Sequence, residues 1–157
     1  PQSRLVHHEG ELAMVLGRRT RRVERAEALS HVLGYTTAID VSARDIQRRE
    51  GKYTRGKGFD TFCPVGPRVR LGAEGWRPTD ELLTLHVNGA ERQRSKVDDL
   101  IFDLDEIVSF ISHVMTLEPG DIILTGTPAG VGPIEGGDAV EVAIEGVGEL
   151  RVTGHRE

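Results

Sequence analysis

Three acidic residues have the types and the spacing to hold a divalent cation. Glu9 and Glu11 lie at the start of the apolar segment 11–16, which ends at Gly17 and predicts a buried strand. Side chains two positions apart on a strand share a face, so both carboxylates point the same way. Burying them together costs several kcal/mol unless a cation lies between them. Asp40 follows a later β-prone segment and completes an all-oxygen set, which favours hard ions such as Mg²⁺, Mn²⁺ or Ca²⁺.

The same residues also have an ordinary structural interpretation. Glu-x-Glu is common on half-exposed strands, and Asp40 has the position of a cap for a helix that begins near Ser42. His7 shares the face of Glu9, so it either lines a site or has a surface or structural role. His7 and His8 make no zinc motif, because H-E-x-x-H requires a second histidine four residues after the first. Spacing alone therefore leaves both interpretations open.

The strands that must position these residues form a β-rich pattern. Segment 35–39 is β-prone and leads into Asp40. Segment 82–87 predicts another strand, followed by the hairpin signal Asn88-Gly89. Further strands are predicted at 121–125 and in the alternating segments around Val140–Ile144 and Leu150–Val152.

Two or three helices complete the predicted fold, which we assign to the α+β class with mostly β structure. The segment from Val23 to Leu33 has apolar residues near helical spacing, and Gly34 is a natural stop. A second helix is predicted to start near Ser42 and Asp45, and the polar segment 52–60 predicts a loop. The clearest helix covers 103–115, where one apolar stripe contains Ile107, Phe110, Ile111, Val114 and Met115.

Length and composition exclude several classes of protein. The 157 residues suit one domain spanning 1–157, and the net charge of −5 with few aromatic residues argues against a nucleic-acid binder. No apolar stretch reaches the ~20 residues that span a membrane, so no membrane partner is expected. Cys63 is the only cysteine, which excludes an intrachain disulfide and fits a reducing, cytoplasmic setting. With no activating histidine nearby in sequence, Cys63 is interpreted as a small buried residue.

Four separated segments, in order, resemble the fumarylacetoacetate hydrolase family. They are LVHHEGELAMVLG (5–17), GYTTAIDVSARDIQ (34–47), KGFDTFCP (57–64) and LEPGDIILTGTPAGVG (117–132). The last segment is not a phosphate-binding loop, because it lacks Gly-Lys-Ser/Thr and Pro128 removes an amide donor. The resemblance implies rolled, layered β-sheets and a homodimer. It further implies that Glu9, Glu11 and Asp40 hold one Mg²⁺ or Mn²⁺.

The resemblance also assigns residues to a substrate. Lys57 matches the family's active-site lysine, and Thr127 with nearby backbone amides is expected to bind a substrate carboxylate. If the helix begins right after Asp40, Arg44 and Gln47 share its face, and Gln47 can hydrogen-bond the substrate. Arg44 itself is interpreted as part of a structural ion pair or cap.

The expected function is a metal-dependent enzyme of aromatic-acid breakdown that acts on small 2-oxo or 2-hydroxy dicarboxylic acids. Isomerisation or decarboxylation through a metal-stabilised enolate is the first hypothesis, as in the 2-hydroxyhepta-2,4-diene-1,7-dioate isomerases. The alternatives are an acylpyruvate hydrolase, an oxaloacetate decarboxylase and a non-catalytic metal- or carboxylate-binding module. Because the chain starts at Pro1, we expect an N-terminal segment to be missing. In the family, that segment carries a His and a Glu that close over the metal.

Overall fold

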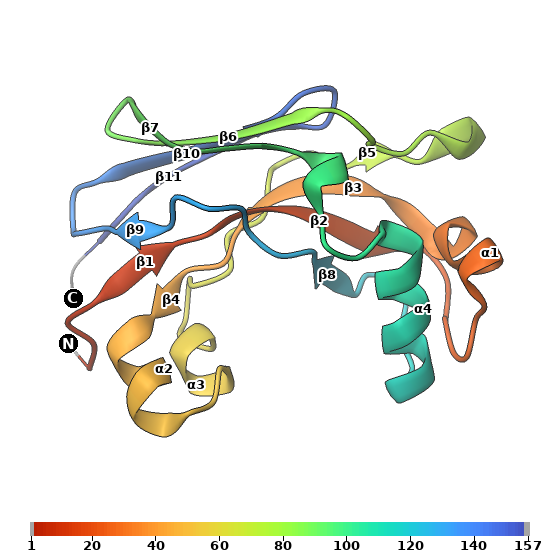
Figure 1. The fold of residues 1–157 in the computed structure, drawn as a ribbon, viewed down its shortest axis with the longest axis horizontal. Helices are drawn as coiled ribbons and strands as arrows, with labels where there is room; N and C mark the ends of the chain where they lie inside the picture. The colour runs from red at the N-terminus through yellow and green to blue at the C-terminus, as the bar shows by residue number, and fades with distance from the viewer. Residues whose placement is uncertain (1, 156–157) are drawn as a thin grey trace.

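The strands form three antiparallel sheets in the computed structural model, which describes residues 2–155 (Figure 1). One four-stranded sheet has the order β5 (Arg70–Leu71), β3 (Val32–Ile39), β2 (Gly10–Leu16) and β8 (Ile122–Leu124). The other has the order β11 (Gly148–Thr153), β10 (Ala139–Ile144), β6 (Leu82–Val87) and β7 (Ala90–Lys96). A three-stranded sheet joins β4 (Ser42–Ala43), β1 (Val6–His8) and β9 (Gly132–Pro133). This layered, mostly β architecture confirms the predicted fold class.

Four α-helices lie within residues 2–155, which is one more than the upper number predicted. They are α1 (Arg25–Ala28), α2 (Arg44–Glu50), α3 (Thr54–Lys57) and α4 (Leu104–Val114). Short 3₁₀ turns occur at Leu29–His31, Ala73–Gly75 and Val97–Asp99. The additional helix is α3, a single turn inside the segment predicted to be a loop. None of these helices is long and apolar enough to cross a membrane.

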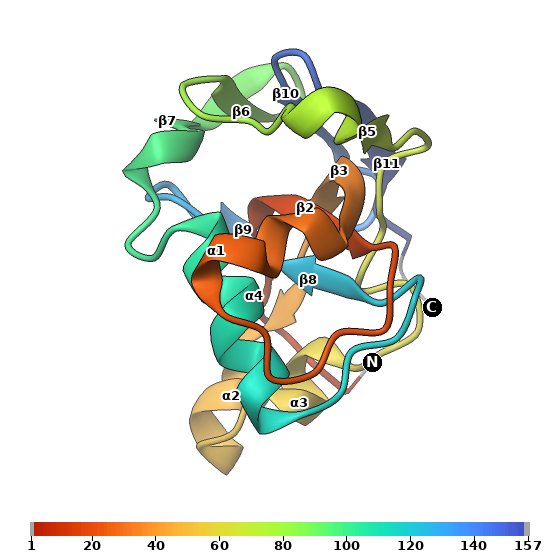
Figure 2. The same ribbon diagram turned by 90° about the vertical axis from the view of Figure 1, so that its right-hand side faces the viewer.

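The two four-stranded sheets stack face to face, as Figures 1 and 2 show, and the core lies between them. Leu12 and Met14 of β2 and Leu85 and Val142 of the opposite sheet are buried there. At Gly10 the sheets approach so closely that a Cβ atom would lie 2.8 Å from Leu85 Cδ1. A larger residue between the two glutamates would therefore force the Leu85 side chain or β2 itself to shift.

The hairpin of β6 and β7 confirms the signal at Asn88-Gly89. Both turn residues have positive φ, 52° for Asn88 and 79° for Gly89, as the tight turn requires. The alternating strands β10 and β11 are confirmed as well, with Val142 paired to Leu150. The strand predicted at 121–125 is present in shorter form as β8.

The helix predicted to stop at Gly34 ends earlier. The helical segment finishes at His31, and β3 begins at Val32, so Gly34 lies inside a strand. A Cβ atom on Gly34 would lie 2.3 Å from the carbonyl oxygen of Arg70 in β5. Close packing of two strands, and not helix termination, explains this glycine.

Only part of the apolar stripe predicted for the 103–115 helix packs on the core, namely Ile107 and Ile111. Phe110, Val114 and Met115 are 70%, 66% and 57% exposed, whereas Leu104 and Val108 are buried. The helix also buries two serines, whose hydroxyls bond to nearby backbone carbonyl groups. These hydrogen bonds let polar residues occupy the inner face, so hydrophobicity alone placed that face too far toward Phe110, Val114 and Met115.

Candidate metal centre

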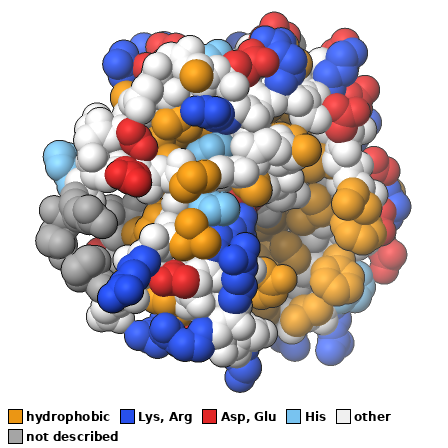
Figure 3. All heavy atoms as spheres, turned by 60° about the vertical axis from the view of Figure 1, so that its left-hand side comes forward, with side chains coloured by type: hydrophobic (Ala, Val, Ile, Leu, Met, Phe, Trp, Pro, Cys, Tyr) orange, Lys and Arg blue, Asp and Glu red, His pale blue; other side chains and the backbone are white. Residues whose placement is uncertain are grey.

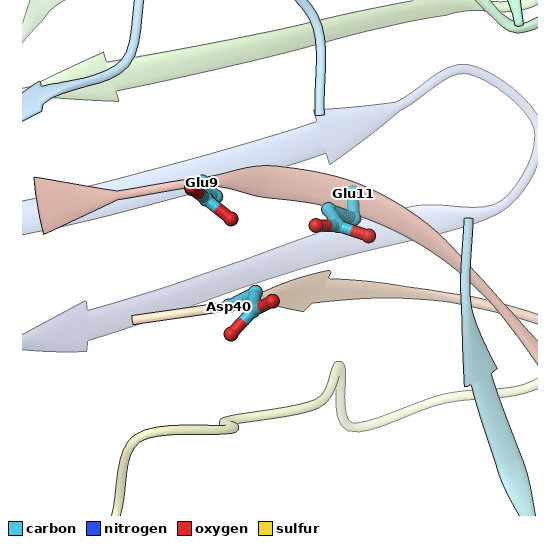
Figure 4. Close-up of side chains that lie close together, drawn as sticks. All are labelled: Glu9, Glu11 and Asp40. Atoms are coloured by element: carbon cyan, nitrogen blue, oxygen red, sulfur yellow. The ribbon is translucent and has the colours of Figure 1, made fainter. Parts of the chain in front are cut away.

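The three carboxylates singled out from the sequence converge on one small space. Oxygen atoms of Glu9, Glu11 and Asp40 all lie within 4.8 Å of one another (Figure 4). Glu9 lies between β1 and β2, Glu11 is in β2, and Asp40 directly follows β3. The pairing of Gly10 with Ile39 places Asp40 beside Glu9, and the Asp40 N–H donates to the Glu9 carbonyl at 2.8 Å. Strand register therefore brings the three carboxylates together, and their role as metal ligands stays a prediction.

The cluster is buried and surrounded by polar contacts. Glu9 and Glu11 are only 6% and 3% exposed. The Gly126 N–H donates to Glu11 Oε2 at 2.6 Å. Burial nevertheless raises the pKa of Glu11 to about 7, with the nearby Asp40 and Glu9 charges adding to the effect and the Gly126 hydrogen bond opposing it. The pKa of Asp40 is likewise raised by burial, against the opposing contact with Lys57.

Two cationic side chains contact the cluster from one side. Lys57 Nζ lies 2.9 Å from Glu9 Oε2 and also donates to Asp40 Oδ2. Arg44 donates to Glu9 Oε1. Burial lowers the pKa of Lys57, but its hydrogen bonds to Asp40 and Glu9 outweigh burial and raise it. Lys57 is therefore an ammonium ion at neutral pH. A lysine that loses its proton readily would need a lowered pKa, which is the opposite of what these contacts produce.

The donor set fits a divalent cation. Three ionised carboxylates carry −3 and the two cations beside them +2, which leaves a negative balance in a desolvated space. Burial and the neighbouring carboxylates Asp40 and Glu9 raise the pKa of Glu11 more than the Gly126 hydrogen bond and Lys57 lower it. A hard cation bound by these oxygens would supply a compensating positive charge. Neither cysteine nor histidine contributes to the cluster, which agrees with the all-oxygen set predicted.

Helix α2 begins later than predicted and still brings Arg44 and Gln47 together. Ser42 and Ala43 form β4, which pairs with β1, so the helix starts at Arg44 and has no side-chain cap from Asp40. Arg44 Nη1 donates to Gln47 Oε1 at 2.8 Å. The ion pair expected of Arg44 is present, and its partner is Glu9 of the carboxylate cluster.

A pocket adjoins the carboxylate cluster on the α2 side. Its volume is about 400 Å³, and it is lined by Arg44, Gln47, Arg48, Gly51 and Tyr53. Lys and Arg side chains gather in the lower part of the face shown in Figure 3. Burial lowers the pKa of the neighbouring His7, and the charges of Arg44 and Arg48 lower it further. The pocket is therefore a basic environment open to an anionic group.

The loop after β8 closes the other side of the cluster. Besides the Gly126 contact with Glu11, Thr127 Oγ1 donates to the Gly10 carbonyl at 2.9 Å. Thr127 thus lies next to the strand that carries Glu11, and its hydroxyl hydrogen bonds to protein, while its binding of a substrate carboxylate stays a prediction. Gly126 has a φ of 101°, which an L-residue adopts only with strain.

Gln93 and Cys63 are the two residues that sequence reasoning misjudged. Gln93 lies in β7, is 1% exposed and contacts both Gly10 and Thr127. Its strand, AERQRSK, is polar throughout, so no alternation marked it as inward-facing. Cys63 is exposed, which corrects the prediction of a buried residue. Its thiol pKa is raised by partial desolvation and by the Asp40 and Glu11 charges, so it is not an activated nucleophile.

Comparison with known proteins identifies the family. The sequence pattern described as "Fumarylacetoacetate (FAA) hydrolase C-terminal" matches residues 1–153. The chain belongs to the fumarylacetoacetate hydrolase family. It is 42% identical over 152 residues to a mitochondrial oxaloacetate tautomerase of Bos taurus, covering 92% of this chain and 67% of the relative.

Solved structures agree with this assignment. The 2-hydroxyhepta-2,4-diene-1,7-dioate isomerase from Mycobacterium marinum matches with a TM-score of 0.95 and 51% identity, over 99% of this chain and 61% of that one. Fumarylpyruvate hydrolase from Pseudomonas aeruginosa, solved in complex with Mn²⁺ and pyruvate, matches with a TM-score of 0.93 and 37% identity, over 99% and 68%. The chain spans 55% to 66% of the length of three curated relatives that it matches at 46% identity or more.

Proposed function

We propose that this protein is a divalent-metal-dependent isomerase of small 2-oxo or 2-hydroxy dicarboxylic acids, which shifts them between keto, enol and conjugated forms. The convergence of Glu9, Glu11 and Asp40 within 4.8 Å, beside the ammonium group of Lys57, carries the proposal. The tautomerase and isomerase relatives support it. Aromatic-acid breakdown is the proposed setting.

Glu9, Glu11 and Asp40 would hold Mg²⁺ or Mn²⁺. When bound, such an ion supplies Lewis-acid stabilisation to the enolate of a 2-oxo acid. The complex of Mn²⁺ and pyruvate in the Pseudomonas aeruginosa hydrolase supports a site that takes both a divalent cation and a 2-oxo acid. Oxygen ligands without cysteine favour both ions, and we place Mg²⁺ first.

Lys57 would stabilise negative charge on the substrate. Its contacts with Glu9 and Asp40 keep it protonated, so its ammonium group can attract an enolate oxygen and hold a proton close to it. The position of Lys57 at the end of α3, a single helical turn, fixes its backbone beside the cluster while the long side chain can adjust. A positive charge held in this way favours the enolate over the neutral keto form.

The basic pocket would bind the second carboxylate of a dicarboxylic acid. Arg44 reaches from the cluster to the pocket wall, where Arg48 and Tyr53 also lie. Gln47, held by Arg44, adds an amide that can donate to a carboxylate oxygen. A substrate with two carboxylates can therefore satisfy both regions, whereas a monocarboxylate would leave the pocket cations without a partner.

Hydrolysis of acylpyruvates is the second candidate. The match to fumarylpyruvate hydrolase favours it, because the same enolate forms when water cleaves a C–C bond to give pyruvate and a carboxylic acid. Decarboxylation of oxaloacetate would proceed through the same enolate and release CO₂. Only the products distinguish these reactions.

The test is a substrate panel applied to the full-length protein with Mg²⁺ or Mn²⁺. Enol and keto oxaloacetate, a 2-hydroxydienedioate and an acylpyruvate are each followed by absorbance, and products are identified by mass and by CO₂ release. Isomerisation without a change in mass supports the proposal, and cleavage products support the hydrolase. Turnover that is equal in wild type and in Glu11→Gln would contradict a role for the cluster, and an inactive protein that binds Mn²⁺ would be a binding module.

We further propose that the protein forms a homodimer. The exposed apolar side chains of α4 support an association surface, since a monomer seldom exposes several large apolar groups on one helix. Light scattering on the full-length protein tests this, because a monomer mass at micromolar concentration would contradict it.

A further inference from the structure

Gln93 is a buried polar residue in a strand that is otherwise polar and accessible. In β7 every other residue is exposed or half-exposed, whereas Gln93 is 1% exposed. Burying a side-chain amide is costly unless each of its polar atoms has a hydrogen-bond partner. An inward-facing apolar residue would have avoided that cost. The hydrogen bonds of the Gln93 amide must therefore explain why a polar residue is buried here.

Both ends of the Gln93 amide are occupied, and the partners fix its orientation. Oε1 accepts from the Gly10 N–H at 3.0 Å and lies 3.2 Å from His8 Nδ1. Nε2 donates to the Pro128 carbonyl at 2.9 Å and to Thr127 Oγ1 at 2.8 Å. A backbone N–H can only donate and a carbonyl can only accept, so the amide cannot be reversed. It follows that His8 carries its hydrogen on Nδ1.

The same contacts fix the hydroxyl of Thr127. Its oxygen accepts from Gln93, and its single hydrogen is donated to the Gly10 carbonyl. The hydroxyl therefore has no hydrogen left for a substrate. In the part of the chain that the structure describes, the backbone N–H of Thr127 has no protein acceptor, so it is the donor that this residue can offer.

Gly10 links these contacts to the metal-binding strand. It lies between Glu9 and Glu11, and both of its backbone hydrogen-bonding groups are bound by Gln93 and Thr127. Gln93 therefore joins two segments more than 100 residues apart in the sequence, the carboxylate-bearing strand and the loop of Thr127. β8 ends at Leu124, and after Thr125, which donates to the Leu12 carbonyl, the loop contacts the strand only through Gly126 and Thr127 in the part of the chain that the structure describes.

We propose that Gln93 is a positioning residue that sets the Thr127 loop relative to the carboxylate cluster, so that the Thr127 N–H faces the bound substrate carboxylate. This inference rests on the proposed function, because it assumes that a 2-oxo acid binds between the cluster and the loop. Gln93 does not touch the substrate. It acts on ligand binding through Thr127, whereas the backbone of the carboxylate-bearing strand is also held by its ladder with β3, in which Gln93 takes no part.

The experiment compares ligand binding with metal binding in the full-length protein. Oxalate, a mimic of the pyruvate enolate, is titrated calorimetrically into protein with saturating Mg²⁺, and Mn²⁺ affinity is measured without oxalate. Gln93→Leu removes the whole amide, whereas Gln93→Glu keeps an oxygen for Gly10 and His8 but replaces the donor to Thr127. Ser109→Ala is the matched control, since it deletes a partly buried hydrogen bond to the Val23 carbonyl, in α4 and outside this loop.

Both Gln93 variants are expected to weaken oxalate binding about 10- to 100-fold, the usual effect of removing a residue that orients a binding group, with Mn²⁺ affinity nearly unchanged. Ser109→Ala should change neither affinity. If Gln93→Leu does not fold, Gln93→Glu decides.

Equal losses of oxalate and Mn²⁺ affinity would overturn the proposal, because they indicate general disruption. Gln93 variants that bind oxalate as tightly as Ser109→Ala does would overturn it as well. A wild-type protein that binds no oxalate with Mg²⁺ would instead reject the proposed function, and this inference with it.

Discussion

Lys57 Nζ lies 2.9 Å from Glu9 Oε2, so an ammonium ion contacts one of the carboxylates of the cluster. The amine and a divalent cation therefore compete for the same carboxylate charge. We predict that Lys57→Met lowers kcat/KM about 10²- to 10³-fold, as expected for loss of a charge that stabilises an oxyanion. Mn²⁺ should bind the variant as tightly as wild type or more tightly. Weaker Mn²⁺ binding would show instead that Lys57 assembles the cluster.

Metal affinity should depend on pH through Glu11. Its pKa of about 7 means that a proton must leave before the carboxylate can bind a cation. Affinity for Mn²⁺ should therefore fall as the pH drops below 7, approaching about tenfold per pH unit for one released proton. Calorimetry in buffers of different ionisation enthalpy counts the protons directly. An affinity that is constant between pH 6 and pH 8 would contradict the assignment.

The metal-free protein should be destabilised by the same carboxylate at high pH. The folded pKa of Glu11 lies above its unfolded value of 4.5, so its stabilising contribution is complete below 4.5 and is lost as pH rises through about 7. Glu11→Gln should therefore raise the free energy of unfolding of metal-free protein at pH 8, by at most about 3 kcal/mol. Chemical denaturation with a chelator present measures it.

The advantage of the variant should shrink as the pH is lowered and vanish below about pH 4.5. An equal difference between the two proteins at every pH would show that ionisation of Glu11 is not its cause. Adding Mn²⁺ at pH 8 should reverse the order of stability, because only wild type keeps the complete set of ligands.

Gly10→Ala tests the close approach of the sheets. The new Cβ would lie 2.8 Å from Leu85 Cδ1 and 3.3 Å from Val142 Cγ2. We predict a loss of about 1–3 kcal/mol in the free energy of unfolding, typical of an overpacked core. Gly132→Ala is the control, because its nearest neighbour would be 3.4 Å away, at His8 Nε2. Similar urea midpoints for both variants would contradict the packing argument.

Strand periodicity puts Glu9 and Glu11 on one face, but it left an ordinary structural role open, and the family resemblance favoured the cluster. Asp40 was added to the predicted cluster because it directly follows another predicted strand, at 35–39. Lys57 was different, because a polar loop gives no local signal for a contact 48 residues away, and the family resemblance supplied it. The function of the whole protein stays a proposal, since the chain spans only part of its relatives.

Other features depended on tertiary contacts that local patterns do not contain. Gly34 resembled a helix stop, but the carbonyl of Arg70 in another strand explains it. Ser42 resembled a helix start and instead pairs with His7 in a short sheet. Gln93 was missed because its burial comes from the loop and strand that close over it, and its own strand shows no apolar pattern.

Titration of Mn²⁺ into the full-length protein by calorimetry tests the central claim most directly. Wild type is compared with Glu9→Gln, Glu11→Gln and Asp40→Asn, and Glu91→Gln is the control because its carboxylate lies in an exposed ion pair with Arg94. The account predicts a single site in wild type and in the control, with binding lost or weakened by at least about 10-fold in each of the other three variants. Binding that all three variants retain, or a wild type that binds no Mn²⁺, would contradict it.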